Sequence, residues 1–423
     1  MRSLKEYDRK TAMNYGLIGE HLPHSFSKDI HEMIGGYDYI LHEVAKDKLD
    51  DFMTARDFKG INVTIPYKQD VIPYLTGISD RAEKIGAVNT IVNKEGKLYG
   101  DNTDFGGLKA LVKRTGIDMN GKKVIILGTG GTSKTAYAVA DSLGAAEICK
   151  ASRTAKNNAL YYEEIYQKHA DADVIINTTP CGMFPNVDSV AIDIDRFTKL
   201  TGVLDVVYNP LRTKLVAKAQ KKGIKSACGL YMLVSQAIIA SEVFMEKKHT
   251  ENLTDAIYRK IYKEKENIVL TGMPRSGKTT LGKILAKSLS RPLIDTDDMI
   301  IKKTGKTPSE IFAEEGEKYF RDVESEVVRE ISVKTGLVIS TGGVAILRNE
   351  NVDALKMNGK LFFLDRPLDA LLPTKDRPLA NSKEKIIALY KTRRPIYLAA
   401  ADEIIKVEGT PRHTAEFILK EYR

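Results

Sequence analysis

Two glycine-rich stretches carry the residue types and spacing that bind phosphate groups. The stretch "GTGGTSKTA" (128–136) follows one apolar run, and "TGMPRSGKTT" (271–280) follows another. Glycine permits a tight turn and a close backbone approach, and the amides at the N-terminus of the next helix stabilise negative charge. The sequence therefore predicts two phosphate-binding sites, and the residues around each loop indicate its chemistry.

The first loop is predicted to bind a dinucleotide. Its glycines lie where a buried strand turns into a helix, with the spacing G-x-G-G-x-x-x-A, and the next strand ends in "ASRT". A loop that binds the ribose of NAD usually places Asp or Glu at that strand end, whereas arginine pairs with a 2′-phosphate. This favours NADP over NAD, with the cofactor-binding residues Gly128, Gly130, Gly131, Ser152, Arg153 and Thr154.

Three polar stretches precede this loop: "HSFSKDIHE", "NVTIPYK" and "GAVNTIV…GDNTDFGG". Lys68 follows a proline that ends a strand, and Asn89 and Asp104 are expected in turns. A lysine and an aspartate near NADPH can protonate or deprotonate a substrate oxygen during hydride transfer. The residues alone thus indicate a hydride-transferring enzyme that acts on a small polyol or keto acid.

The second loop fits the pattern G-x-x-x-x-G-K-[ST] at Gly272, Gly277, Lys278 and Thr279, between a strand and a helix. In this pattern backbone amides surround the phosphates, the lysine contacts the β- and γ-oxygens, and the hydroxyl coordinates Mg²⁺. With Thr280 added, these residues are the predicted ATP site, and Thr279 is a predicted magnesium ligand.

Acidic and basic residues follow this loop in an order that suits a hydroxylated acid as phosphoryl acceptor. A carboxylate at Asp297 can accept hydrogen bonds from substrate hydroxyls and orient the attacking one, and arginines match a substrate carboxylate. The segments concerned are "LIDTDDMI", "YFRDVESEV" with Arg321 and Glu324, "STGGVAI", "KDRPLA" and "KTRRPIYLAAAD".

The elements that position these residues belong to more than one domain. At 423 residues the chain is too long for one ordinary core, and short apolar runs alternate with amphipathic stretches, which is typical of α/β domains. Residues 122–153 read as one βαβ unit, and "GLYMLVSQAIIASEVFM" and "TENLTDAIYRKIYKEKE" as helices. The second of these is strongly charged and ends where a new strand begins, so the main boundary is predicted near residues 263–266.

Composition excludes several classes of protein. The net charge of +9 comes from scattered lysines, with no nucleic-acid-binding motif and no tryptophan, so no nucleic-acid partner is expected. No apolar run reaches the roughly 18–20 residues of a membrane span, and the polar N-terminus predicts no signal peptide. Cys149, Cys181 and Cys228 form no disulfide framework, which fits a reducing cytoplasm.

Residues 13 to about 262 resemble shikimate dehydrogenases. The resemblance is carried by "HSFS", "NVTIPYK", "GAVNT", "NTDFGG", "GTGGTSKTA", "NTTPCGM", "DVVYNP" and "GLYMLVSQA", in that order. It implies Lys68 and Asp104 as the catalytic pair at the carbonyl being reduced. It further implies a substrate site of Ser25 and Ser27 for the carboxylate, Thr64, Asn89 and Gln236 for the ring hydroxyls, and Tyr208 and Gly229 between the two lobes.

Residues from about 266 to 423 resemble shikimate kinases. The resemblance implies Asp295 on the Mg²⁺ side and Arg377 from the lid in contact with both phosphates and acceptor. The implied shikimate ligands are Asp297, Arg321, Gly342, Gly343 and Arg393, and the implied catalytic residues are Lys278, Asp297 and Arg377. Three features depart from the family: Arg275 replaces a usual glycine, Val344 replaces a common third glycine, and the lid is short.

The expected fold is α/β: a two-lobed dehydrogenase with an α/β substrate domain and a Rossmann NADP domain, followed by a P-loop α/β kinase domain with a parallel sheet. The predicted boundaries are 1–12 for an N-terminal extension, 13–105 completed by 236–262 for the substrate domain, 106–235 for the NADP domain and 266–423 for the kinase domain.

The expected function is reduction of 3-dehydroshikimate with NADPH, followed by phosphorylation of shikimate with ATP and Mg²⁺. Two alternatives stay open at this point. One is a quinate/shikimate dehydrogenase, and the other is a kinase-like half that binds ligand without catalysis, which Arg275 and the altered lid motivate.

Overall fold

The computed structural model describes residues 13–22, 25–154, 158–371 and 382–422. The chain forms two compact units. The first comprises the described residues up to Asn209 together with Thr213–Ile261, and the second comprises Pro210–Arg212 and the chain from Tyr262 onward.

The first unit begins with a mixed six-stranded sheet of order β2-β1-β3-β5-β6-β4. Strands β1, β2 and β3 are parallel, and β5 runs antiparallel to both β3 and β6. Its strands are β1 (Tyr15–Gly19), β2 (Tyr39–Glu43), β3 (Gly60–Val63), β4 (Gly77–Ile78), β5 (Thr90–Lys94) and β6 (Lys97–Asp101). The helices between them are α1 (Ser27–Ile34), α2 (Leu49–Ala55) and α3 (Asp80–Ile85).

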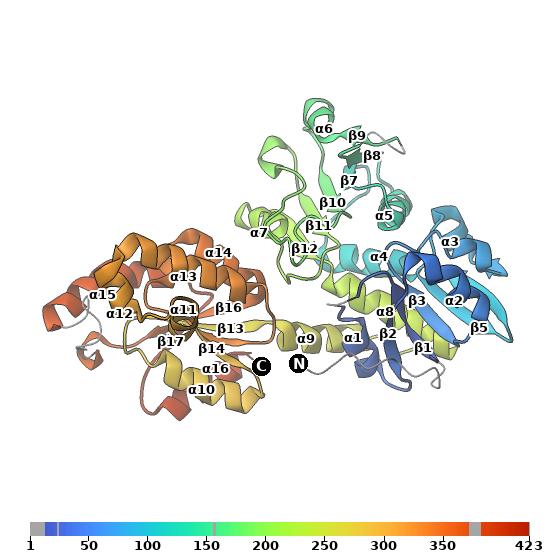
Figure 1. Ribbon diagram of the computed structural model, residues 1–423. Coiled ribbons are helices and arrows are strands. Elements are labelled where there is room, and N and C mark those ends of the chain that lie inside the picture. The colour runs from blue at the N-terminus through green and yellow to red at the C-terminus, as the bar shows by residue number, and fades with distance from the viewer. Residues whose placement is uncertain (1–12, 23–24, 155–157, 372–381, 423) are drawn as a thin grey trace. The chain divides into compact units, whose positions relative to one another are not determined.

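The second sheet of this unit is parallel throughout, with the order β12-β11-β10-β7-β8-β9 (Figure 1). The order reverses between β7 and β10, and in such sheets ligands bind beyond the carboxyl ends of the strands at the reversal. The strands are β7 (Lys123–Leu127), β8 (Glu147–Ser152), β9 (Leu160–Tyr161), β10 (Val174–Asn177), β11 (Gly202–Asp205) and β12 (Lys225–Cys228). The helices that alternate with them are α5 (Gly131–Ser142), α6 (Tyr162–Lys168) and α7 (Lys214–Lys221).

Helices α4 (Thr103–Thr115) and α8 (Leu230–Met245) connect the two sheets. Helix α8 is apolar on nearly all sides, because Met232 packs in the core of the parallel sheet while Ala240 and Phe244 pack in the core of the mixed sheet. A helix that is buried on all sides has apolar residues around its whole circumference and not on one face only, and α8 follows this pattern. Gln236 therefore lies on the element shared by the two lobes. The charged helix α9 (Leu253–Lys265) follows.

The second unit has a five-stranded parallel sheet of order β14-β15-β13-β16-β17. Its strands are apolar on both faces, as expected where helices cover both. Ile268 and Leu270 of β13 pack against α10 and α16, and Phe363 of β16 stacks on Tyr397 of α15. The strands are β13 (Asn267–Thr271), β14 (Leu293–Asp295), β15 (Val338–Ser340), β16 (Gly359–Asp365) and β17 (Glu403–Lys406). The helices are α10 (Lys278–Leu289), α11 (Thr296–Thr304), α12 (Pro308–Glu314), α13 (Gly316–Ser332), α14 (Asn349–Asn358), α15 (Lys383–Ala400) and α16 (Pro411–Tyr422).

This architecture confirms the α/β fold class, including the parallel sheet that follows the second glycine loop. One local expectation is wrong: Asp104 lies in the first turn of α4, not in a turn between elements. The helix begins there because the Asn102 side chain accepts a hydrogen bond from the backbone N–H of Phe105 (3.1 Å), which caps its N-terminus.

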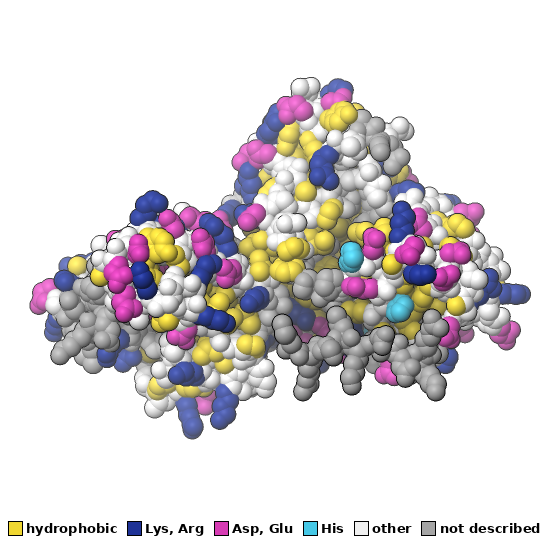
Figure 2. Space-filling view, viewed as in Figure 1, with side chains coloured by type: hydrophobic (Ala, Val, Ile, Leu, Met, Phe, Trp, Pro, Cys, Tyr) yellow, Lys and Arg dark blue, Asp and Glu magenta, His cyan; other side chains and the backbone are white. Residues whose placement is uncertain are grey.

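The molecular surface agrees with the scattered charge of the sequence. Figure 2 shows acidic and basic side chains intermingled over the face in view. Among the helices of the described segments, none has the length and apolar character that a membrane crossing requires.

Candidate active sites

Lys68 and Asp104 form a close pair in the first unit. The Lys68 ammonium donates to Asp104 Oδ2 at 2.5 Å, and the two side chains are only 13% and 9% exposed. Lys68 follows β3, and Asp104 lies in the first turn of α4, where the helix dipole stabilises a negative charge. Residues far apart in sequence thus place an ammonium and a carboxylate within proton-transfer distance.

A buried network of polar side chains includes two of the predicted substrate ligands. The Asn89 amide nitrogen donates to Thr103 Oγ1 (3.0 Å) and to Gln236 Oε1 (3.4 Å), and Thr103 Oγ1 lies 3.3 Å from the same Gln236 oxygen. Thr103 was missed by sequence reasoning, although it directly precedes Asp104 in "NTDFGG". The network gathers amide and hydroxyl groups of the kind that recognise hydroxylated ligands.

The paired serines lie near Tyr208. Ser25 Oγ accepts a hydrogen bond from the backbone N–H of Ser27 (3.2 Å), and the Ser25 side chain lies close to the Tyr208 hydroxyl. Burial raises the pKa of Tyr208, so its phenol stays protonated. The Phe26 ring packs against the Tyr208 ring with centroids 5.3 Å apart. Hydroxyls from two separate segments are thereby brought together.

Two further predicted substrate residues, Thr64 and Gly229, also make close backbone contacts. Thr64 follows β3, and its backbone N–H donates to the Ile18 carbonyl (2.9 Å). At Gly229 an added Cβ would lie 2.1 Å from the Val206 carbonyl oxygen, so no larger residue fits. Packing alone therefore explains the glycine that precedes α8.

The first glycine loop has the geometry that a pyrophosphate needs. Gly128 has φ = +110°, and a Cβ there would lie 2.8 Å from Thr178 Oγ1. Among the residues that the structure describes, no side chain caps the N-terminus of α5 at Gly130, so its amides face outward as an anion site. At Gly131 an added Cβ would touch Lys68 at 3.4 Å, so the loop lies beside the Lys68–Asp104 pair.

The strand end expected to bind the 2′-phosphate lies next to this loop. The backbone N–H of Gly128 donates to the Ala151 carbonyl (2.8 Å), and β8 ends one residue later, at Ser152. Arg153 and Thr154 follow as exposed residues. The donor set therefore fits NADP.

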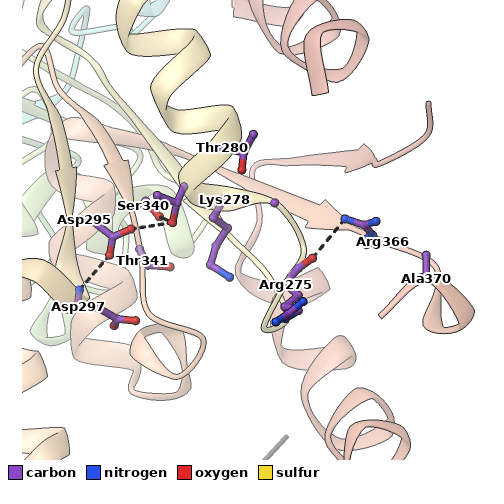
Figure 3. Close-up of a pocket in the computed structure, with 11 residues that line it drawn as sticks. Arg275, Lys278, Thr280, Asp295, Asp297, Ser340, Thr341, Arg366 and Ala370 are labelled. Carbon is purple, nitrogen blue, oxygen red and sulfur yellow. Dashed lines mark hydrogen bonds between the residues drawn. The ribbon is translucent and has the colours of Figure 1, made fainter. Parts of the chain in front are cut away.

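The second glycine loop borders a cavity of about 380 Å³ in the second unit (Figure 3). Lys278 begins α10, and its ammonium donates to the carbonyls of Gly272 and Met273 (2.9 Å each). The positive φ of Gly272 (+151°) and Gly277 (+100°) lets the loop curve around the lysine. The cavity is lined by Arg275, Gly277, Lys278, Thr279, Thr280, Asp295, Asp297, Ser340, Thr341, Arg366 and Ala370.

Two oxygen donors in this cavity fit Mg²⁺. Thr279 Oγ1 donates to Asp295 Oδ2 at 2.9 Å. The other carboxylate oxygen of Asp295 accepts from the backbone N–H of Asp297 (3.1 Å), which fixes the carboxylate at the start of α11. Hard oxygen ligands with room for water are what Mg²⁺ requires.

The predicted acceptor residues meet on one side of the same unit. An added Cβ on Gly342 would lie 2.8 Å from Asp297 Oδ1 and 2.9 Å from Glu324 Oε1. Arg321 donates to the Val344 carbonyl (3.2 Å), and Arg393 donates to the Gly343 carbonyl (3.5 Å). Carboxylates and arginines thus surround the backbone of the "TGG" turn.

Glu324 belongs to this group although it was not among the predicted ligands. Burial raises its pKa to about 8, with Arg321 opposing the shift and Asp297 adding to it. Within the described residues both of its carboxyl oxygens are buried without a hydrogen-bond partner. A buried polar group without a partner is one that a bound ligand can satisfy.

The structure describes two of the three departures from the family pattern. Arg275 has φ = +63°, the left-handed region that favours glycine, whereas Val344 has an ordinary φ of −122° and is buried. The carbonyl of Arg275 accepts from Arg366 (3.3 Å), a cavity residue that sequence reasoning missed. Arg377 and most of the lid lie outside the described residues.

We expect Arg275→Gly to bind ATP better than Arg275→Ala. Both variants lose the guanidinium, but only alanine keeps the left-handed penalty of about 1–2 kcal/mol, so the Michaelis constant for ATP should be roughly fivefold or more lower in the glycine variant. Initial phosphorylation rates against ATP concentration measure this. Equal constants in the two variants would mean that the backbone conformation of Arg275 does not limit nucleotide binding.

Comparisons with known sequence families match both units. Residues 17–91 match the shikimate dehydrogenase substrate binding domain, and residues 274–423 match shikimate kinase. These two segments contain the Lys68 side of the first site and most of the cavity in the second unit.

Individual relatives cover the first unit. The shikimate dehydrogenase (NADP(+)) of Clostridium beijerinckii is 39% identical over 264 residues, which is 58% of this chain and 96% of its own length. The enzyme of the same name from Methanosphaera stadtmanae is 36% identical over 260 residues, 55% of this chain and 91% of its own length.

Solved structures agree. Shikimate dehydrogenase 1 from Peptoclostridium difficile is 36% identical, with a TM-score of 0.55, and covers 59% of this chain and 98% of its own. A chorismate mutase/shikimate 5-dehydrogenase fusion protein from Clostridium acetobutylicum is 33% identical, with a TM-score of 0.56 and coverages of 59% and 97%. Shikimate 5-dehydrogenase from Thermus thermophilus, in complex with NADP(H) and shikimate, is 26% identical, with a TM-score of 0.52 and coverages of 59% and 99%.

Proposed function

The chain belongs to the shikimate dehydrogenase family over its first unit and carries a shikimate kinase domain in its second, and we propose that it catalyses two consecutive reactions. The first unit reduces 3-dehydroshikimate to shikimate with NADPH. The second unit transfers the γ-phosphoryl group of ATP to the hydroxyl just formed, giving shikimate 3-phosphate. The observation that supports this most is that each unit combines a phosphate-binding glycine loop with acid–base side chains of its own.

In the reductase, NADPH supplies the hydride when bound, and the chain supplies the proton and the orientation. Lys68 gives a proton to the substrate oxygen as the ketone becomes an alcohol, while Asp104 holds the lysine in place and accepts a hydrogen bond from a substrate hydroxyl. Because Lys68 lies against Gly131, the proton donor and the cofactor loop face the same carbonyl. The low exposure of the pair strengthens its electrostatic effect.

Recognition of the reductase substrate follows from the polar groups of the two lobes. Ser25 and Ser27 would donate to the substrate carboxylate, and Asn89 and Gln236 would bind the ring hydroxyls. Thr103 joins the amide network and would hold its orientation. Such a site suits a small acid with several hydroxyls.

In the kinase, ATP supplies the phosphoryl group when bound, with Mg²⁺ held on the side of Thr279 and Asp295. Lys278 would exchange its two backbone carbonyl partners for phosphate oxygens. Asp297 orients the attacking hydroxyl and takes its proton, while Arg321 and Arg393 bind the acceptor carboxylate. Positioning and charge supply most of the catalysis in phosphoryl transfer.

The alternative functions are less well supported. A ligand-binding module without catalysis has no need for the lysine, threonine and paired carboxylates that line a single cavity. A quinate/shikimate dehydrogenase remains distinguishable by experiment, because it would turn over quinate with NAD, whereas the "SRT" strand end favours NADP.

A coupled assay tests the proposal. The full chain is supplied with 3-dehydroshikimate, NADPH, ATP and Mg²⁺, and we expect NADPH oxidation together with shikimate 3-phosphate as the final product. Omission of ATP should stop the sequence at shikimate. If ATP, Mg²⁺ and added shikimate yield no phosphorylated product, the bifunctional proposal is wrong. A preference for quinate and NAD would instead support the catabolic alternative.

A further inference from the structure

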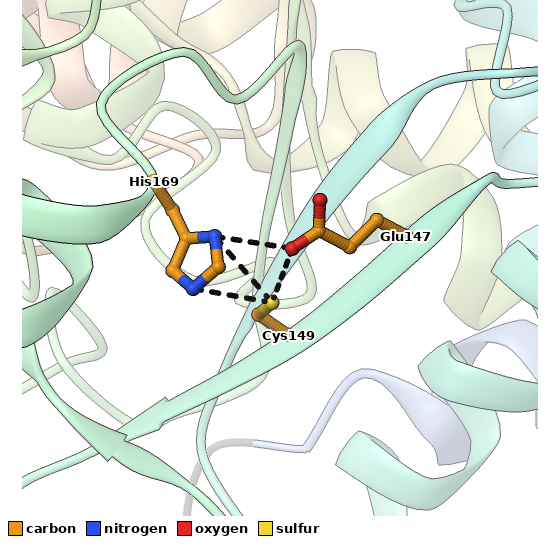
Figure 4. Close-up of side chains that lie close together, drawn as sticks. All are labelled: Glu147, Cys149 and His169. Atoms are coloured by element: carbon orange, nitrogen blue, oxygen red, sulfur yellow. Dashed lines mark hydrogen bonds and ion pairs between the residues drawn. The ribbon is translucent and has the colours of Figure 1, made fainter.

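Three side chains that the proposed reactions do not use meet on the parallel sheet of the first unit: Glu147, Cys149 and His169 (Figure 4). Glu147 and Cys149 are two residues apart on β8, so their side chains lie on the same face of the sheet. His169 directly follows α6, where its backbone N–H donates to the Ile165 carbonyl (2.8 Å) and ends the helix. Two elements therefore contribute to one cluster.

The spacing of the three ligand atoms matches a tetrahedral metal site. Cys149 Sγ lies 3.4 Å from Glu147 Oε1 and almost equally far from both His169 ring nitrogens, 3.7 Å from Nδ1 and 3.6 Å from Nε2. Of the two nitrogens, Nδ1 also lies 3.2 Å from the same carboxylate oxygen, so it is the one placed to share an ion with it. With zinc bond lengths of about 2.3 Å to sulfur and 2.0–2.1 Å to nitrogen and oxygen, the edges of a tetrahedron are about 3.3–3.6 Å. One ion can therefore contact all three atoms with small side-chain movements.

Neighbouring charges hold the carboxylate in the orientation that a metal ligand needs. Lys123 contacts the other carboxylate oxygen, Glu147 Oε2, at 3.1 Å, and also contacts Asp171 at 2.9 Å. Lys123 thus occupies Oε2 and leaves Oε1 facing the sulfur and the imidazole. Such outer contacts orient the direct ligands in known metal sites.

Other uses of the cysteine fit less well. Burial raises the pKa of Cys149 to about 11, with the Glu147 carboxylate adding to the shift, so the free thiol is a poor nucleophile at neutral pH. The three cysteines are all free, so no disulfide uses it. Three different donors of sulfur, nitrogen and oxygen around one point are chemically suited to a borderline-soft divalent ion.

We propose that Glu147, Cys149 and His169 bind a zinc-class divalent ion, with water as the fourth ligand. Binding replaces the thiol proton, which leaves to solvent, by a metal–sulfur bond. The ion links β8 to the turn after α6 and stabilises the lobe in which the other end of the same strand carries Ser152, with Arg153 directly after it. The site is distinct from the magnesium donors of the second unit, which are all oxygen atoms.

Cobalt(II) titration of the chelator-treated full chain tests this site. With excess Mg²⁺ present to occupy the oxygen ligands of the kinase cavity, we expect a thiolate-to-cobalt charge-transfer band that saturates at a single ion per chain and disappears when Zn²⁺ is added. Zn²⁺ should also raise the unfolding temperature of the first unit, because an ion that binds only the folded state stabilises it.

Substitution of the proposed ligands tests which side chains bind the ion. We expect Cys149→Ser to lose the band and the zinc-dependent rise in unfolding temperature, and His169→Gln to weaken cobalt binding at least tenfold. Cys181→Ser and Cys228→Ser are matched controls that should retain both signals. Circular dichroism checks that each variant folds, and Glu147→Gln replaces Cys149→Ser if the latter does not. A wild-type chain without the band, or a band that survives Cys149→Ser, would overturn the proposal.

Discussion

Lys68→Ala is expected to lower kcat for NADPH-dependent reduction by roughly 10²–10⁴-fold, the usual contribution of a positioned general acid. Phosphorylation of shikimate by the same variant should continue at the wild-type rate. Lys68 provides the only ammonium that the structure pairs with Asp104 among the described residues, and the pair is largely shielded from water. Loss of the ammonium removes the proton donor and leaves the carboxylate without its partner.

The fall in kcat caused by loss of the proton donor must be separated from any loss of stability caused by the same substitution. Removal of one member of a buried ion pair can destabilise a protein by about 3–5 kcal/mol, because the remaining charge is uncompensated. The double variant Lys68→Ala, Asp104→Asn removes both charges and so relieves that cost. We expect it to regain stability but not reduction.

Lys46→Ala is a suitable control, because Lys46 is exposed and belongs to the same lobe. It should reduce 3-dehydroshikimate normally. If Lys68→Ala lowered both the reductase and the kinase rates, the two reactions would not be catalysed by independent sets of residues. If it lowered neither, Lys68 would have no catalytic role.

The features that were predicted well are those encoded by short segments. The glycines at 128–131 and 272–277 predict strand–loop–helix units, because such turns need positive φ or close backbone packing. In the structure Gly128, Gly272 and Gly277 all have positive φ, and Gly128 and Gly272 also have closely packed neighbours. The alternating apolar runs likewise indicate parallel sheets covered on both faces, and two of the three sheets are fully parallel. At these positions the residue types within a short segment are sufficient to predict the local structure.

The features that were missed depend on long-range packing. Glu324 was singled out in the segment "YFRDVESEV" but not as a ligand, because only the folded unit buries it beside Asp297. Thr103 acquires its role from contact with Gln236, more than a hundred residues away. Arg366 reaches the loop carbonyl of Arg275 only because β13 and β16 are neighbours. Spacing along the chain carries no signal for such contacts.

Asp297→Asn is expected to produce the second large effect, a loss of about 10²–10⁴-fold in kcat for phosphorylation with reduction unchanged. Asparagine keeps the size and can still accept a hydrogen bond, but it cannot take the proton of the attacking hydroxyl. The Asp297 carboxylate lies beside Gly342 and lines the same cavity as Lys278 and Thr279, so the change affects the acceptor side of the site.

The neighbouring residue supplies a close control for this variant. Asp298 is the next residue on α11 and is exposed, so Asp298→Asn removes the same charge from the same helix turn without altering the cavity. We expect its kinase rate to match wild type. The Michaelis constant for ATP should change little in either variant, because Thr279, Asp295 and the loop amides stay in place. A rise in that constant with unchanged kcat would instead place Asp297 on the nucleotide side, contrary to its proposed role as the group that orients and deprotonates the acceptor hydroxyl.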